Sequence, residues 1–563
     1  MSSPILFGID LGTTNTLIAH FLPMGVEGEI QLIEGVDGDV LIPSVVHFYP
    51  GSREYCVGSN ALAYELDHPD RTFRWMKRHI GSQQAWTVEL SEGEHIEVDA
   101  RTVSARILKA VLKRAQQWLR LPEIPNEAVI SVPAYFSEQE KVATKEAAEI
   151  AGLTHSRLIE EPTAAVFDFV YALKRTGQLG RRFPDGKGYI LVFDLGGGTF
   201  DVSVAHLDLM LAQEPQVRIV ANHGIRNLGG FNFDMELLKY GLDQAKVRFP
   251  SKMLVGELAE AIRELEYDGR ISNRQYASLI SDALITAETC KQRLSNVPRP
   301  EITQPFNIVL GYGEQVSLEI SRGEFETLLE PFILQIKSVL QETLTILIEN
   351  TDGEISNWEQ LDEVILVGGS TRIPAIRDLL KDTFGYEPTE DVRKDQVVVK
   401  GAAIQAAIDS GFQVLQVARC TAYDYGIGGP DGMSRVIIPR GSLYPSENKT
   451  KYPVPFSLTT RQPITIVENT WSVQGTLNPK IIKEVSYHHP LLLTGDELEV
   501  TCSIDESGLL RVFVEDPRNG EAVESSIKDI SMTDEEKEQA RADVQHEISP
   551  DTEWDPDEMD DNE

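Results

Sequence analysis

Two short segments of the sequence combine an aspartate with a run of glycines and threonines. Asp10 begins the run Asp-Leu-Gly-Thr-Thr-Asn, and Asp194 begins the run Asp-Leu-Gly-Gly-Gly-Thr. Glycine lets backbone N–H groups approach an anion closely, and successive N–H groups in a turn form a concave anion site. Carboxylate oxygens beside such a turn suit Mg²⁺, which prefers hard oxygen ligands. The two runs therefore predict a site for a phosphate group and magnesium.

The same two runs form an internal repeat. Each lies between two apolar, strand-like segments, in residues 7–20 and 191–204. One such turn is more often a plain hairpin, but two copies with matching aspartates favour a shared function. We expect a duplicated, two-lobed domain whose loops face each other. The sequence contains no GxxxxGK[ST] motif, which excludes a P-loop protein.

A third glycine-containing turn lies near residue 368. The apolar run 364–367 predicts a strand, Gly368 and Gly369 a turn, and Pro374 the first turn of a helix. Ser370 or Thr371 is the predicted cap of that helix. A glycine turn at a helix start favours close approach of a nucleotide, although alone it could equally be a structural turn. The GxGxxG spacing of dinucleotide-binding folds is absent.

These turns must be positioned by a larger α/β region. Short apolar runs alternate with helical patterns from Ile5 to about Ala407, whereas residues 420–530 carry only strand-like alternation, including a hairpin over 498–514. A capping box at Ser137–Glu140 opens one helix. The expected helices are 101–119, 141–151, 324–349 and 534–544.

Composition restricts the class of protein. The chain has 563 residues, 41% hydrophobic and 25% charged, which is typical of globular domains. A net charge of −36 argues against nucleic-acid partners and anionic membrane surfaces. We expect no membrane-spanning segment, no signal peptide, a cytoplasmic location and reduced thiols at the four separated cysteines.

Six ordered motifs carry a resemblance to a known family. They are GIDLGTTNT at Gly8, VPAYFS at Val132, LIEEPTAA at Leu158, VFDLGGGTFDVS at Val192, LGG at Leu228 and VILVGGSTRIP at Val364. This set, with the segment ELEVTCSIDESGLLRVFVED, resembles the DnaK-type seventy-kilodalton heat-shock chaperone family, over nearly the whole chain to about Ile530.

The resemblance implies an α/β fold. A two-lobed actin-like (ribonuclease-H-like) ATPase domain would be followed by an antiparallel β peptide-binding domain and a short acidic tail. The implied boundaries are 1–411 for the ATPase domain, 412–419 for a linker, 420–530 for the β domain and 531–563 for a short helix and an acidic disordered tail without a helical lid.

The resemblance also implies an activity. The protein would be an ATP-dependent chaperone that binds unfolded or extended polypeptides and slowly hydrolyses ATP to ADP with Mg²⁺. A J-domain co-chaperone and a nucleotide exchange factor would be partners, and nucleic acid and membranes would not.

Carried over position by position, the family's motifs imply site residues in this chain. The catalytic positions are Asp10, Lys77, Glu161, Asp194 and Thr199, with Asp10 and Asp194 holding Mg²⁺ through water. The nucleotide-binding positions are Gly12, Thr13, Thr14, Asn15, Gly196, Gly197, Gly198, Gly229, Gly230, Glu288, Lys291, Ser295, Gly368, Gly369, Ser370, Arg372 and Asp395.

The chain departs from the family pattern at several places. Gln416 and Arg419 replace apolar and acidic linker positions, and Lys141 stands where an arginine involved in interdomain signalling is usual. Glu160 replaces an asparagine, and residues 444–452 carry an insertion among the peptide-binding loops. Only 33 residues follow Ile530, fewer than a helical lid needs. These changes put the coupling of ATP to peptide release in doubt.

Two other classes of function remain open from the sequence. One is a non-chaperone actin-like ATPase, such as a small-molecule kinase or a filament former. The other is a specialised regulator with one dedicated protein partner, which the altered linker permits. The β region argues against the first class, because kinases and filament proteins have no reason to append it.

Overall fold

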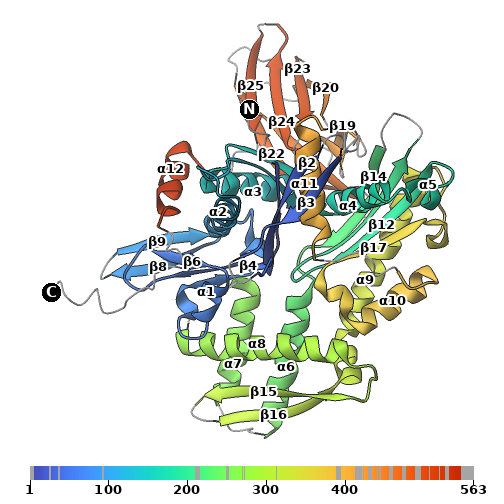
Figure 1. Cartoon of the computed structure of the whole chain (residues 1–563). Helices are drawn as coiled ribbons and strands as arrows, with labels where there is room; N and C mark the ends of the chain where they lie inside the picture. Colours follow the sequence, from blue (N-terminus) through green and yellow to red (C-terminus); the bar gives the residue numbers. More distant parts are fainter. Residues whose placement is uncertain are drawn as a thin grey trace.

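A computed structural model describes most of the chain (Figure 1). The described residues are 6–24, 27–35, 38–91, 94–209, 216–248, 253–268, 271, 273–311, 314–388, 395–412, 421, 424–428, 434–439, 442, 445–454, 461–471, 477–488, 496–505, 508–518, 520–526 and 532–546. The predicted linker, apart from Phe412, and the acidic run from Asp551 lie outside these residues.

The first sheet contains the first glycine turn. Its strands run in the order β11-β10-β1-β2-β3, with β4 beside β2. The bounds are β1 Leu6–Leu11, β2 Asn15–Met24, β3 Glu27–Leu32, β4 Ile42–Pro43, β10 Glu127–Val132 and β11 His155–Glu160. Because β1, β10 and β11 are parallel, their carboxyl ends meet at one edge, which brings Asp10 and Glu161 together.

The second sheet repeats this arrangement, as the internal repeat predicts. Its order is β14-β13-β12-β17, with an antiparallel β12–β13 hairpin and β17 parallel to β12. The bounds are β12 Lys187–Leu195, β13 Phe200–Asp208, β14 Gln216–Ile225 and β17 Glu363–Val367. Asp194 and Gly368 therefore lie at the same edge.

Two helices pack between the sheets. These are α4 (Glu161–Arg175) and α11 (Val397–Asp409), and their apolar side chains share one buried cluster with both sheets. Side chains are absent where the backbones cross: a Cβ on Gly8 would overlap the backbone of Ala403, and a Cβ on Gly401 would overlap that of Ala164. Glycine at these crossings lets the sheets and helices approach closely.

Other helices and small sheets surround this centre. The expected helices are confirmed as α2 (Ala100–Leu119), α3 (Glu138–Ala151), α9 (Arg322–Asn350) and α12 (Asp534–Asp543), and α3 begins with the predicted capping box. The remaining helices are α1 Ser59–Ala63, α5 Leu179–Arg182, α6 Gly230–Arg248, α7 Met253–Asp268, α8 Arg274–Asn296 and α10 Pro374–Phe384. The small sheets contain β5 Val45–Phe48, β6 Tyr55–Val57 and β7 Thr72–Arg74; β8 Ala85–Ser91 and β9 Glu94–Asp99; and β15 Thr303–Gly311 and β16 Glu314–Ser321.

The predicted cap of α10 is wrong. Ser370 and Thr371 lie in a separate 3-10 turn, Gly369–Arg372, and the residue before the helix is Ile373, which makes no side-chain cap bond. The Ser370 hydroxyl instead donates to the Gly196 carbonyl (2.9 Å). The chain therefore uses Ser370 to join the two glycine turns of the second sheet. Pro374 does begin the helix, as predicted.

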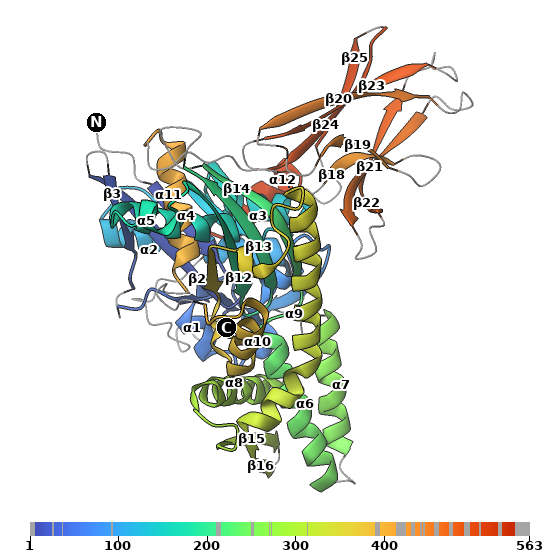
Figure 2. The same cartoon turned by 90° about the vertical axis from the view of Figure 1, so that its right-hand side faces the viewer.

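Helix α9 is the one helix of the described part that is long and apolar enough, by length and composition, to cross a membrane. The sequence analysis expected a helix over 324–349 but no segment able to span a membrane. Its buried side chains belong to the core cluster of the second sheet, and the helix packs along β13, β14 and α6. Figure 2 shows it running past the edge of that sheet. Core packing accounts for only part of its apolar surface, because Leu334 on the same helix is 67% exposed.

The C-terminal β region forms two sheets around a cluster of its own, and the predicted 498–514 hairpin is present. One sheet has the order β19-β18-β21-β22 and the other β20-β23-β24-β25. The bounds are β18 Asp424–Gly428, β19 Ser434–Ile438, β20 Ser446–Pro453, β21 Arg461–Trp471, β22 Leu477–His488, β23 Glu497–Ile504, β24 Leu510–Asp516 and β25 Glu521–Ser526.

The β region contacts the start of α3. The Glu138 carboxylate accepts hydrogen bonds from the Tyr425 hydroxyl (3.1 Å) and the Leu510 backbone N–H (3.0 Å), and Lys141 Nζ lies 3.7 Å away. Burial raises the pKa of Glu138, while the Lys141 charge opposes that shift. Lys141 therefore lies at the contact between the α/β region and the C-terminal β region.

Helix α12 packs on the other end of α3, a contact that the sequence did not predict. Lys537 Nζ lies 2.9 Å from Glu149, and the Tyr55 hydroxyl donates to the Val544 carbonyl (2.7 Å). Val544 is fully buried and Ala540 nearly so, both within the core cluster of the first sheet. In Figure 1, α12 lies beside α2 and α3. The segment 532–546 is therefore packed into the core of the first sheet.

We expect Val544→Ala to lower the free energy of unfolding by about 1–2 kcal/mol, because it removes two buried methyl groups. Urea titration followed by circular dichroism measures this. The control is Glu538→Ala on the same helix, whose side chain is 79% exposed. Equal midpoints for Val544→Ala and the control would show that α12 does not belong to the core in solution.

Candidate functional site

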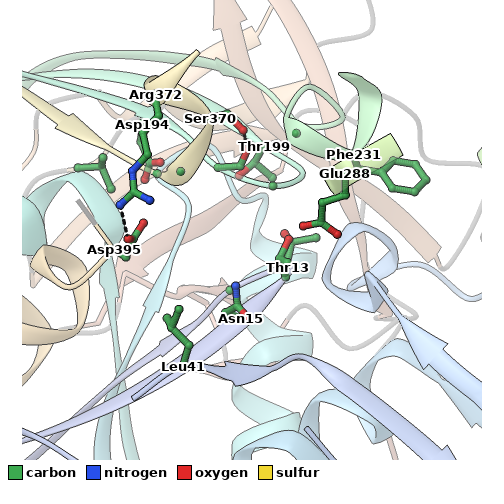
Figure 3. A pocket seen from close by; sticks show the side chains of 18 of the residues that line it. Thr13, Asn15, Leu41, Asp194, Thr199, Phe231, Glu288, Ser370, Arg372 and Asp395 are labelled. Atoms are coloured by element: carbon green, nitrogen blue, oxygen red, sulfur yellow. Dashed lines mark hydrogen bonds and ion pairs between the residues drawn. The ribbon is translucent and has the colours of Figure 1, made fainter. Parts of the chain in front are cut away.

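The carboxyl edges of the two sheets enclose a cavity of about 500 Å³. Figure 3 shows Thr13 and Asn15 on one side, Ser370 and Arg372 on the opposite side, and Glu288 at a third side. The cavity brings together most of the residues expected from the sequence: Asp10, Gly12, Thr13, Thr14, Asn15, Lys77, Glu161, Asp194, Gly196, Gly197, Thr199, Gly230, Glu288, Lys291, Ser295, Gly368, Gly369, Ser370, Arg372 and Asp395.

Gly198 and Gly229, also expected in the site, are not among the residues that line the cavity. A Cβ on Gly229 would come 2.6 Å from the Gly198 nitrogen, so the two backbones touch. The backbone N–H groups of Gly230 and Phe231 donate to the carbonyls of Gly196 (3.0 Å) and Gly197 (2.7 Å). Gly229 therefore supports the second glycine turn from behind.

The two glycine turns also touch each other. A Cβ on Gly197 would overlap the Thr14 hydroxyl, and a Cβ on Gly198 would come 2.9 Å from the Thr13 methyl group. The turns of the two sheets thus face each other, as the repeat predicts, with backbone N–H groups and threonine hydroxyls around one space. Such a concave arrangement suits phosphate oxygens.

Acidic side chains gather around a single lysine at the base of the cavity. Lys77 Nζ donates to the Glu161 carboxylate (2.7 Å), and both side chains are buried. The Ser131 hydroxyl donates to Asp10 (2.7 Å). Glu161 lines the cavity, whereas the adjacent Glu160 is not among its lining residues.

This crowding of negative charge alters the acidity of the carboxyl groups. Burial, and then the Glu161 charge, raises the pKa of Asp10 to about 6. Burial, followed by the charges of Glu161 and Asp10, raises the pKa of Asp194 well above its usual range. One lysine does not balance these carboxylates, so the site favours an additional cation.

The residues present fit a hydrated Mg²⁺ ion. Hard carboxylate oxygens with surplus negative charge, beside a phosphate-sized cradle, are the surroundings that Mg²⁺ adopts when it keeps several waters. Asp10 and Asp194 are the residues that would hold it. A bound Mg²⁺ would neutralise phosphate charge during phosphoryl transfer.

Helix α8 supplies another wall of the cavity. Glu288, Lys291 and Ser295 lie on its one face, as their spacing predicts. Lys291 Nζ is 2.7 Å from Asp234 and 3.1 Å from the Gly230 carbonyl. Across the cavity, Arg372 pairs with Asp395 (2.7 Å), which leaves the flat guanidinium at the wall. A planar base can stack on such a group.

The sequence analysis did not identify several residues of the site. The cavity is also lined by Leu17, Leu41, Trp75, Phe231, Asp234, Gln292, Asn296, Val367, Ile373 and Val398. Asp201 lies buried nearby, and burial, then the charges of Glu161 and Asp194, raises its pKa well above the usual range. Asp201 could have been found, because it follows Thr199 within the repeat. Trp75 and Phe231 had no sequence signal.

Comparison with known proteins gives the class and the family. A family model described as "Hsp70 protein" matches residues 6–561. The chain is 31% identical over 528 residues to the chaperone protein DnaK of Thermotoga neapolitana, covering 91% of this chain and 78% of that protein. It is 33% identical over 444 residues to DnaK of Thermosipho melanesiensis, covering 78% and 66% respectively. Fold, site and matches define an ATP-binding protein of the chaperone type. The chain belongs to the Hsp70 family.

We expect Gly229→Ala to weaken ATP binding by about tenfold or more, because the added methyl group must displace the backbone of the second glycine turn. Isothermal titration calorimetry with Mg·ATP measures the affinity. The control is Gly256→Ala on α7, where a Cβ meets nothing within 4 Å. Wild-type affinity in Gly229→Ala would contradict the supporting role of this glycine.

Proposed function

We propose that the protein is an ATP-dependent chaperone that slowly hydrolyses ATP with Mg²⁺ and binds unfolded or extended polypeptide segments. The observation that carries the proposal is the pair of facing glycine turns, each beside an aspartate, in one cavity with the Lys77–Glu161 ion pair. The two sheets with their helices are the two lobes of an actin-like ATPase domain, residues 1–411. Residues 420–530 are the peptide-binding domain.

Each part of the cavity has a role in this proposal. The backbone N–H groups of the two turns, with Thr13 and Thr14, bind the phosphates. Glu288, Lys291 and Ser295 face the ribose and base, and Arg372 stacks on the base. Lys77 offsets the charge that develops as the terminal phosphate is cleaved.

The remaining polar groups position the lysine, the water and the terminal phosphate. Glu161 holds Lys77 in place and orients water near Asp10, and the Thr199 hydroxyl lies by the terminal phosphate. The enclosed site lowers the competition from bulk water, so these fixed charges act strongly.

We expect Lys77→Ala to lower the single-turnover hydrolysis rate by about a hundredfold or more while nucleotide binding is retained, because it removes the charge opposite the transferred phosphoryl group. Thr199→Ala should also slow turnover, and EDTA should stop it. Lys246→Ala, a lysine with a 51% exposed side chain, is the control. Hydrolysis by Lys77→Ala at the wild-type rate would overturn the assignment of this lysine.

The peptide-binding part of the proposal rests on the edges of the β region. Strand β22 ends its sheet, and the apolar side chain of Ile481 on this strand is 66% exposed. An extended peptide can add to a sheet edge through backbone hydrogen bonds while an exposed apolar side chain contacts the peptide.

We expect Ile481→Lys to weaken binding of an apolar heptapeptide to the full-length protein by about tenfold, since burial of such a side chain contributes about 1.5–3 kcal/mol. Fluorescence anisotropy with ADP and with ATP measures the affinity. The control is Val309→Lys on β15, a 38% exposed residue far along the chain. If the wild-type protein binds no denatured polypeptide at all, the regulator with one dedicated partner becomes the better explanation.

A further inference from the structure

A second, smaller cavity of about 160 Å³ adjoins the nucleotide cavity. We call it the arginine chamber, and it is lined by Arg74, Trp75, Arg78, His79, Asn227, Phe231, Leu265 and Glu266. A water molecule occupies roughly 30 Å³ in the liquid, so the chamber can hold a small oxyanion. Trp75 and Phe231 line both cavities. These two rings therefore form the wall between them.

The wall is a stack of aromatic and guanidinium groups from both sides of the nucleotide cavity. The rings of Trp75 and Phe231 have centroids 4.7 Å apart. The Arg74 guanidinium lies 4.4 Å from the Trp75 ring centroid, and that of Arg78 lies 4.4 Å from the Phe231 centroid. Trp75 has a φ of 62°, a costly conformation for a bulky residue that these contacts hold in place.

The two arginines of the chamber differ in their charge partners. Arg74 is paired with Glu65 (3.3 Å) and with Glu288 (3.0 Å), so its charge is balanced. Among the described residues, the Arg78 guanidinium has neither an ion-pair partner nor a hydrogen-bond acceptor. Glu266, the acidic residue of the chamber, pairs instead with Lys239 (2.7 Å).

The Arg78 side chain is thus a cation with free donors at the chamber. Burial lowers the pKa of Arg78 to about 10, so it remains charged at neutral pH. Arg78 is half-buried, and its guanidinium fork matches the oxygens of a phosphate group. The chamber therefore has the charge and the donor geometry for a small oxyanion.

The chamber lies directly behind the second glycine turn. The Cδ atom of Arg78 is 3.4 Å from the position of a Cβ on Gly198, and Thr13 of the opposite turn touches the same glycine. Arg78 also follows Lys77 in the chain. The Arg78 stem therefore lies between the second glycine turn and the chamber.

We propose that the arginine chamber binds the inorganic phosphate released by ATP hydrolysis, with Arg78 as its principal ligand, and delays the departure of this product. The proposal rests on the proposed function. In the hydrolysis step a water oxygen bonds to the terminal phosphorus and the bond from phosphorus to the ADP oxygen breaks. The products are ADP, inorganic phosphate and a proton, and no other reactant is needed. The phosphate passes from the turns to the chamber along the Trp75–Phe231 wall.

The binding test uses the full-length protein and inorganic phosphate as the probe. With the nucleotide cavity saturated by a non-hydrolysable ATP analogue and Mg²⁺, calorimetric titration with phosphate reports on the chamber. We expect Arg78→Met to weaken this binding by at least about tenfold, the loss of a charge-assisted hydrogen-bonded pair. Arg78→Lys, which keeps the charge without the fork, should give an intermediate affinity. Arg263→Met, at a side chain 66% exposed on α7, should bind phosphate as the wild type does.

The kinetic test compares two signals in one turnover. Rapid quenching measures cleavage, and a fluorescent phosphate sensor measures release. In the wild type, release should lag behind cleavage, and in Arg78→Met the two signals should coincide. A lag that is unchanged in Arg78→Met, or phosphate binding equal to that of the wild type, would overturn the proposal.

A further titration separates this proposal from the proposed function. If the protein binds no ATP analogue, phosphate binding to the nucleotide-free protein still tests the chamber, and only its dependence on Arg78 supports a site there. The other outcome is that the analogue binds and ATP is cleaved, but the phosphate affinity is the same with and without Arg78. That result would overturn the phosphate site in the chamber and leave the proposed ATPase activity supported.

Discussion

The structure depends on backbone segments that approach more closely than any side chain would allow. The turn at Gly197 and Gly198 is held between the Thr13–Thr14 turn on one side and Gly229 on the other. The carbonyl groups of Gly196 and Gly197 accept hydrogen bonds from the N–H groups of Gly230 and Phe231, which hold the turn in place. The same close backbone contacts therefore hold the two sheets together and shape the phosphate cradle. A side chain added at these contacts would push the two sheets apart and disrupt the cradle.

The charge of the cavity follows from the same closeness. Because parallel strands end at one edge, Asp10, Glu161 and Asp194 are brought together with Lys77 as the nearby cation. Burial and mutual repulsion raise the pKa values of both aspartates, which is a cost of the folded state without a bound cation. The fold therefore holds a site whose charge is completed by a ligand. The Arg78 guanidinium, behind the turn, is instead a positive charge without an ion-pair partner among the described residues.

The local parts of this arrangement could be predicted from the sequence. The repeated hairpins, the Ser137 capping box and the α8 face with Glu288 and Lys291 depend on residues close together in the chain. The helix cap predicted at Ser370 was wrong because its hydroxyl bonds to Gly196, a residue distant in sequence. Local sequence patterns do not report such long-range contacts. The same holds for Trp75 and Phe231, which carry no motif and become part of the site only when the two sheets meet. Their positions depend on tertiary packing and not on any local signal.

The docking of the last described helix has a consequence for how the chain is made. The core cluster of the first sheet is built from residues between Phe7 and Leu158, yet Ala540 and Val544 complete it. Domains fold from the N-terminus during synthesis, and contacts of large sequence separation form slowly. The first part to leave the ribosome therefore waits with an uncovered apolar face until nearly the whole chain has been translated. A protein of the chaperone class would itself spend its synthesis as a partly folded polypeptide of the kind that chaperones bind.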